Sequence, residues 1–270
     1  MIPLTATIIT KNEERNIRDC LESIRWVPHI VVIDSGSTDA TVEIAREFTN
    51  NVIVTDWPGH VEQKNRAVDR AETNWVLSLD ADERATPELR REVERVMATE
   101  PTTVGFSFRR KTWYLGRWIL HGGWYPDRKV RLFDRRRARW GGTNPHDHVN
   151  VEGPVEELDA DILHYTYRDM HHHVEVIDFF TDIAAREREK KGRRFPVLGM
   201  VFGPPFKFLK MYVVKRGYRD GFPGFLIAGL GALYVLLKDA KLWERRQFRE
   251  RTLDPDAQPR FDRGPEYRVR

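Results

Sequence analysis

The sequence predicts an α/β protein with a Rossmann-like, mostly parallel sheet that carries helices on both faces, followed by a C-terminal helical region. Three observations support this fold class. Short β-rich segments alternate with amphipathic segments through the first 80 residues, as in doubly wound parallel sheets. Two of the expected strands end in acidic residues, and from residue 168 the apolar pattern becomes helical. We therefore expect a catalytic domain over residues 1–167, a helical region over 168–252 and a disordered tail over 253–270.

Length and composition narrow the class of protein. The 270 residues, 40% of them apolar, suit one α/β domain with a helical extension. The net charge of +4 gives no reason to expect a nucleic-acid partner. Cys20 is the one cysteine, which excludes a disulfide framework and fits a reducing cytoplasm. The first residues lack the pattern of a signal peptide, so a cytoplasmic protein is expected.

The first part of the chain alternates strands and helices. Thr and Ile favour extended structure in the first segment, and apolar residues at positions i, i+3, i+4 and i+7 then indicate a helix. Ser37 or Asp39 is expected to cap the second helix. The expected elements are, in order, strand Leu4–Thr10, helix Ile17–Ile24, strand Ile30–Asp34, helix Val42–Phe48, strand Asn51–Thr55 and helix Val61–Ala71.

The next segment, Trp75–Leu79, is an apolar run that predicts a buried strand. Asp80 and Asp82 follow it directly, at the edge where open α/β sheets bind ligands. Paired carboxylates suit a hard divalent cation, Mg²⁺ or Mn²⁺. Most D-x-D pairs are solvated turns or helix caps, but the position of this one favours a metal site. Asp34 closes the second strand and either accepts from a nucleoside or caps the next helix.

Later segments are less regular. Thr86-Pro87 predicts the start of a helix. Further strands are expected around Phe106–Phe108, over Lys129–Phe133 and over Ile162–Tyr167. His164 in the last of them is either a third metal ligand, better suited to Mn²⁺ than to Mg²⁺, or a buried structural histidine.

No glycine-rich phosphate loop follows the first strand, which counts against dinucleotide oxidoreductases and kinases. The segments ITKNEERNI, VIDSGSTDATVEIA and GHVEQKNRAVDRAETNWVLSLDADE instead resemble the family-2 glycosyltransferases of the GT-A fold. GWYPDRKVRLF and HYTYRD narrow the resemblance to the bacterial branch related to lipopolysaccharide-core glycosyltransferases. The resemblance implies inverting, metal-dependent transfer of a hexosyl or heptosyl group. The donor would be a nucleotide-diphosphate sugar and the acceptor a glycan or lipid-linked molecule of the cell envelope.

The resemblance also implies roles for individual residues. Asp82 would hold the Mg or Mn ion. Relatives usually carry a His-Glu pair, with the acid as catalytic base, where this chain has His146-Asp147, so Asp147 is the expected base. The alternative for Asp147 is a polar loop in which it caps a turn. The residues expected to bind the nucleotide-sugar are Thr10, Asn12, Glu13, Asp34, Lys64 and Asp80.

Aromatic residues crowd into the glycine-rich segment 113–125. Aromatic rings stack on sugar faces, so the segment is a candidate acceptor-site flap, although core packing explains any single tryptophan as well. The acceptor-site candidates are Trp113, Trp124, Asp127 and His146.

The C-terminal region combines apolar and basic stretches. Phe222–Leu237 is apolar for sixteen residues and is flanked by lysines and arginines. Such a segment is short for a membrane span, so it predicts a helix in a membrane interface or a buried hairpin. A peripheral location on the inner face of the cytoplasmic membrane follows from the first alternative.

Three rival functions stay open at this point. A nucleotidyltransferase that makes a nucleotide-sugar also uses metal carboxylates, but usually has a glycine-rich basic loop after the first strand. A non-catalytic sugar- or nucleotide-binding module would need neither Asp82 nor Asp147. A membrane-surface scaffold would need only the C-terminal region.

Overall fold

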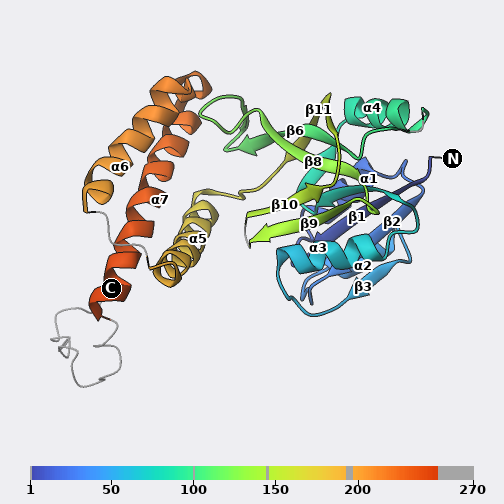
Figure 1. Cartoon of the computed structure of the whole chain (residues 1–270), viewed down its shortest axis with the longest axis horizontal. Helices are drawn as coiled ribbons and strands as arrows, with labels where there is room; N and C mark the ends of the chain where they lie inside the picture. The colour runs from blue at the N-terminus through green and yellow to red at the C-terminus, as the bar shows by residue number, and fades with distance from the viewer. Residues whose placement is uncertain (1, 100, 144–145, 193–196, 249–270) are drawn as a thin grey trace.

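The structure is a computed structural model that describes residues 2–99, 101–143, 146–192 and 197–248. Its centre is a nine-stranded sheet with the strand order β3-β2-β1-β4-β8-β6-β11-β5, and β7 pairs with β6 (Figure 1). The strands are β1 (Leu4–Thr10), β2 (His29–Asp34), β3 (Val52–Val54), β4 (Trp75–Asp80), β5 (Glu83–Ala85), β6 (Gly105–Tyr114), β7 (Arg117–Ile119), β8 (Asp127–Asp134) and β11 (Val155–His164). A separate hairpin consists of β9 (Ala138–Thr143) and β10 (His146–Val151).

The first four strands in sequence, β1 to β4, form a parallel unit, as the alternation predicts. β8 lies antiparallel between β4 and β6, and β11 returns parallel to β6. The sheet is therefore mixed but mostly parallel, and the predicted fold class is confirmed. The helices of this part are α1 (Ile17–Ser23), α2 (Thr41–Arg46), α3 (His60–Asp69) and α4 (Pro87–Met97).

Helices cover both faces of the sheet because side chains alternate along each strand. Ile8 of β1 belongs to a core cluster with residues of α1, α2 and α4, whereas its neighbour Ile9 packs with Ala67 of α3 on the other face. The β9–β10 hairpin joins α3 on this second face through Trp140 and Val149. The carboxyl ends of the parallel strands are left open between these layers.

Two sequence predictions about local structure are wrong. Neither Ser37 nor Asp39 caps α2, which begins after Ala40. The Ser37 hydroxyl donates to Asp34 instead, and Asp39 accepts from the backbone N–H of Thr41 at 3.1 Å in a local turn. The last strand ends at His164 and not at Tyr167: the Tyr165 N–H still bonds to the backbone carbonyl of Asp82 at 2.9 Å, in register with β5, but the chain then turns toward α5.

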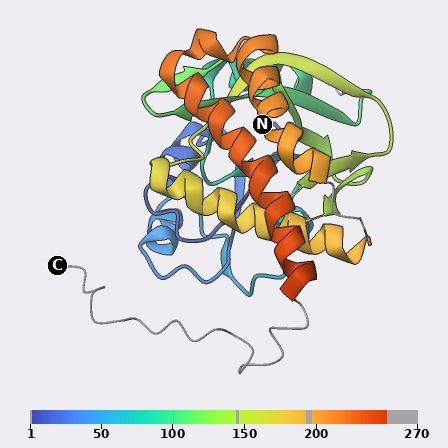
Figure 2. The same cartoon turned by 90° about the vertical axis from the view of Figure 1, so that its left-hand side faces the viewer.

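Three long helices follow the sheet: α5 (Met170–Lys190), α6 (Val197–Leu209) and α7 (Gly221–Phe248). A π-helical turn over Lys210–Val214 and a 3₁₀ turn over Gly217–Asp220 join α6 to α7. Figure 2 shows these helices stacked across one end of the molecule. The predicted apolar segment lies within α7, whereas α6 falls in the expected helical region but was not predicted as a separate helix. The expected tail over residues 253–270 lies outside the described residues.

The helices are tied to the sheet through the segment between β6 and β8. Tyr114 and Ile119 form a buried cluster with Met211, Ile227 and Ala228 of the helical region. The buried carboxylate of Asp220 accepts from the backbone N–H groups of Leu120 (3.2 Å) and His121 (2.8 Å). The candidate acceptor flap is thus fixed to the C-terminal helices by apolar packing and hydrogen bonds.

Candidate active site

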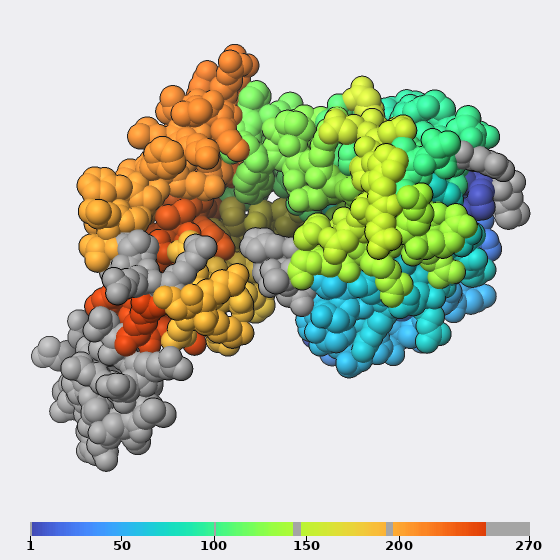
Figure 3. Space-filling model, viewed as in Figure 1, coloured from blue at the N-terminus to red at the C-terminus, as the bar shows by residue number. Residues whose placement is uncertain are grey.

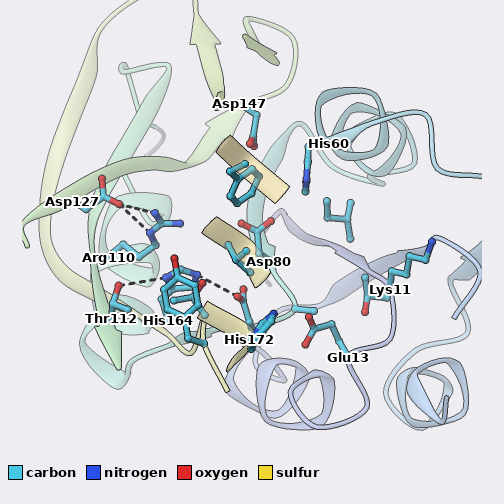
Figure 4. Close-up of a pocket in the computed structure, with 18 of the residues that line it drawn as sticks. Lys11, Glu13, His60, Asp80, Arg110, Thr112, Asp127, Asp147, His164 and His172 are labelled. Atoms are coloured by element: carbon cyan, nitrogen blue, oxygen red, sulfur yellow. Dashed lines mark hydrogen bonds and ion pairs between the residues drawn. The ribbon is translucent and has the colours of Figure 1, made fainter. Parts of the chain in front are cut away.

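A cavity of about 700 Å³ lies at the carboxyl ends of β1 and β4, where α5 approaches the sheet. We call it the main cavity, and Figure 4 shows most of its lining. This is the edge at which open α/β sheets bind ligands. Its charged lining residues are five acids and three bases, namely Glu13, Asp80, Asp82, Asp127 and Asp147, with Lys11, Lys64 and Arg110. This excess of acidic over basic side chains suits a bound cation.

Lys64 joins the first aspartate of the D-x-D pair to the expected base. Its ammonium lies 2.9 Å from Asp80 Oδ1 and 2.7 Å from Asp147 Oδ2, although these residues come from α3, β4 and β10. The ammonium also lies 4.2 Å from the ring centre of Trp140, and the Lys64 side chain is buried. Burial alone would raise the pKa of Asp80, but Lys64 and Arg131 outweigh it and hold that pKa below its usual range.

A buried ion pair below the site fixes the end of β4, and the sequence analysis missed it. The Glu83 side chain is fully buried, accepts from the backbone N–H of Asp80 at 3.0 Å and lies 2.7 Å from Arg131. Arg131 also reaches the second oxygen of Asp80 at 2.9 Å. The available signal was a single arginine inside the apolar run of β8, since an unpaired charge is rarely buried.

Asp82 and His164 form a second pair in the main cavity. Asp82 Oδ2 lies 3.2 Å from His164 Nε2, and the other ring nitrogen lies 3.4 Å from the hydroxyl of Thr112 (Figure 4). A carboxylate next to an imidazole that is oriented through its far nitrogen is a suitable donor set for Mn²⁺. Among the described residues, no three His, Cys, Asp or Glu side chains gather into a metal site. The pair therefore fits a cation that takes its other ligands from substrate oxygens and water.

The expected nucleotide-binding residues separate into two groups. Thr10, Glu13, Lys64 and Asp80 line the main cavity. The hydroxyl of Thr10 is buried and has no hydrogen-bond partner among the described residues, and burial raises the pKa of Glu13. A ligand with polar atoms would satisfy the Thr10 hydroxyl.

Asn12 and Asp34 do not line the main cavity and instead shape the loop after β2. Asp34 Oδ1 accepts from the backbone N–H groups of Gly36 (2.9 Å) and Ser37 (2.8 Å). Asn12 Oδ1 accepts from the Thr38 N–H at 2.8 Å. Gly36 has a φ of +76°, a conformation that favours glycine. In this structure both side chains position a loop beside the cavity.

The acceptor-site candidates also separate. Trp124 and Asp127 line the main cavity, and Arg110 holds Asp127 at 2.8 Å. Trp113 lies outside the lining. Its ring packs edge-on against the ring of Trp118, and the two ring centres are 5.0 Å apart. The side chain of His146 lies outside the described part of the structure.

The chain is similar to several known proteins. The chain is 28% identical to LpsC of Rhizobium meliloti strain 1021, a lipopolysaccharide core biosynthesis glycosyltransferase, over 95% of this chain and 97% of that protein. It is 28% identical to an uncharacterized glycosyltransferase of Rickettsia typhi, over 90% of this chain and 88% of that protein. The crystal structure of residues 1–349 of TarS from S. aureus is also similar, with a TM-score of 0.44 and 15% identity over 90% of this chain and 91% of that one.

The family described as "Glycosyl transferase family 2" matches residues 5–151. The match starts in β1, includes the D-x-D pair and Lys64, and ends with β10, which carries Asp147. It therefore spans more than half of the chain and the charged centre of the main cavity. The chain belongs to glycosyl transferase family 2.

Proposed function

We propose that this glycosyltransferase transfers a sugar, with inversion, from a nucleotide-diphosphate donor to a glycan or lipid-linked acceptor of the lipopolysaccharide-core kind. The observation that supports the proposal best is the Asp80–Lys64–Asp147 arrangement in one cavity. In it, a single lysine bridges the expected base and the carboxyl end of β4, where a donor diphosphate would lie. The similarity to LpsC supports the choice of acceptor class.

The proposed reaction is a single displacement. The acceptor hydroxyl oxygen forms a bond to C1 of the donor sugar while the bond from C1 to the diphosphate oxygen breaks. The bonding electrons leave with the diphosphate, and Asp147 takes the proton of the hydroxyl. Because attack occurs on the face opposite the leaving group, the configuration at C1 inverts. A positioned base contributes about 10²–10⁴-fold to such a step.

The leaving diphosphate needs positive charge around it. Lys64 supplies one charge, and Asp82 with His164 would hold the divalent metal, Mg or Mn. When bound, the cation would neutralise the charge that develops on the leaving group. Thr10 and Glu13 offer a hydroxyl and a carboxylate on the same side of the main cavity for the nucleotide.

The proposed reaction can be tested with purified protein and a panel of labelled UDP-, GDP- and ADP-sugars in the presence of Mn²⁺. We expect one donor class to be hydrolysed slowly to free sugar and nucleoside diphosphate. Formation of pyrophosphate from a sugar 1-phosphate and a nucleoside triphosphate would identify a nucleotidyltransferase instead. Tight binding of a donor without any turnover would identify a binding module.

We further propose that α6 and the start of α7 contact a lipid bilayer. The stretches 197–214 and 217–246 are both long and apolar enough to cross a membrane, and only 6% of the first is buried. Figure 3 shows α6, in orange, on the side of the molecule away from the sheet, and many of its apolar side chains are exposed. The most exposed of them are Val197, Leu198, Phe202 and Phe206. Lys207, Lys210, Lys215, Arg216 and Arg219 follow within the same hairpin.

This proposal predicts binding to anionic vesicles. We expect the full-length protein to co-sediment with vesicles that contain anionic lipid, and high salt to release part of it, because salt screens surface charge over about 10 Å at 0.1 M. Phe202→Ser with Phe206→Ser should weaken the binding. Val54→Ser changes an exposed apolar residue on β3, outside the helical region, and should not. Protein that is monodisperse without detergent and ignores anionic vesicles at low salt would exclude the membrane contact.

A further inference from the structure

A second cavity of about 450 Å³ lies between β8 and the β9–β10 hairpin. We call it the basic cavity. Its volume falls in the range of small-molecule sites. Four side chains line both this cavity and the main one, namely Lys64, Asp80, Arg110 and Asp147. The residues that line only the basic cavity are Arg128, Lys129, Val130, Arg131, Trp140, His148 and Val149.

We infer that the basic cavity binds an anionic group of the acceptor, a phosphate or a carboxylate. This inference rests on the proposed transferase function and specifies its acceptor class. Five basic and two acidic residues line the basic cavity, whereas three basic and five acidic residues line the main cavity. The two cavities therefore have opposite charge preferences on either side of Asp147. One suits a cation and the other an anion.

Two buried donors in the basic cavity lack partners among the described residues. They are Nε of Arg131 and Nε1 of Trp140, whose residues are 3% and 5% exposed. A buried donor without an acceptor costs about 1–3 kcal/mol. Both residues line the basic cavity, and an oxygen-rich ligand or its bound water would satisfy the two donors once these side chains turn toward it.

Arg128 and Lys129 are the most exposed of the five basic residues of this cavity, and their ion pairs are weak. Arg128 pairs at 3.0 Å with Glu157, whose side chain is 65% exposed. Lys129 pairs at 3.1 Å with Asp127, which already binds Arg110. Exposed ion pairs contribute about 0–1 kcal/mol, so an entering anion can replace these partners at little cost.

The position of the basic cavity favours the acceptor over the donor diphosphate. Asp82 and His164, which fit the metal of the donor, line only the main cavity. Asp147 stands in the wall that both cavities share. An acceptor anchored by its anion in the basic cavity would present a neighbouring hydroxyl to Asp147, while the donor occupies the other side.

Calorimetry on the full chain with small probes tests this inference. We expect glucose 6-phosphate and glucuronate to bind at least tenfold more tightly than glucose, and 0.5 M salt to remove the difference. Arg128→Gln with Lys129→Gln should weaken binding of both anions about tenfold. Arg91→Gln removes an equally basic but remote side chain of α4 and should change nothing. Equal binding of glucose and the two anions, or no effect of the double substitution, would overturn the inference.

Competition separates acceptor from donor. Saturating UDP with Mn²⁺ should leave glucose 6-phosphate binding intact, and displacement of the sugar phosphate would show that the cavity serves the donor diphosphate. The donor panel tests the transferase proposal independently. If a donor is hydrolysed but the anions are not preferred, only the acceptor inference fails. If the anions are preferred but no donor turns over, the charge preference stands while its assignment to a glycosyl acceptor fails with the proposed function.

Discussion

Asp147→Asn is expected to lower turnover about 10²–10⁴-fold, the contribution of a positioned general base. The asparagine oxygen can still accept from Lys64, which now lies 2.7 Å from Asp147, so donor binding measured by calorimetry should be retained. Asp147→Glu keeps a carboxylate at this position and should keep partial activity. Both variants should be compared by the rate of sugar release from the donor identified in the panel.

Asp159→Asn is the matched control for this prediction. It removes a carboxylate that is 86% exposed, on β11 and outside both cavities, and should leave turnover unchanged. If Asp147→Asn turns over within about threefold of the parent, far from the loss expected for a base, another acid takes the proton. Asp127 would then be tested first, because it lines the main cavity opposite Arg110.

Removal of the divalent cation should abolish transfer, and Asp82→Asn should have the same effect. No three described side chains form a metal site, and Asp82 with His164 offers two ligands, so the cation's other ligands would come from the donor diphosphate and water. Calorimetry should therefore show much tighter binding of Mn²⁺ in the presence of UDP than in its absence. Asp82→Asn should remove that difference.

The thermal stability of the metal-free protein provides the control for Asp82→Asn. The melting temperature should change little, because Asp82 is partly exposed and asparagine keeps an oxygen that can accept from His164. Asp69→Asn changes a half-exposed acid of α3 and should affect neither UDP-dependent Mn²⁺ binding nor turnover. Full activity of the parent enzyme in excess EDTA would refute the metal requirement.

The sequence was most informative where local chemistry decides structure. β1, β2 and β4 follow from short apolar, β-branched runs, and Thr86-Pro87 starts α4 as predicted, with the Thr86 hydroxyl accepting from the Leu89 N–H. The Glu83–Arg131 pair could not be predicted, because it depends on β8 entering the sheet beside β4. Strand order across that distance in sequence is set by packing of the whole sheet.

The same contrast between local sequence and contacts across the fold applies to the candidate site. Individual acids at strand ends were recognisable, but not that one lysine would contact both Asp80 and Asp147. The hydrogen bonds of Asp34 to Gly36 and Ser37 likewise depend on the loop conformation after β2 and could not be read from the sequence. The α6 helix was missed because Pro204 and Pro205 lie in its interior, where prolines normally end a helix.

The attachment of the acceptor flap to the last helices has a consequence for the order of events during synthesis. The ribosome makes β1 to β4 first, but Leu120 and His121 cannot form their hydrogen bonds to Asp220 until about a hundred more residues have emerged. Tyr114 likewise waits for Ile227 and Ala228. A nascent chain would therefore form the strand ends of the main cavity before the segment between β6 and β8 is fixed. On the proposed function, transfer would begin only when the C-terminal helices have docked.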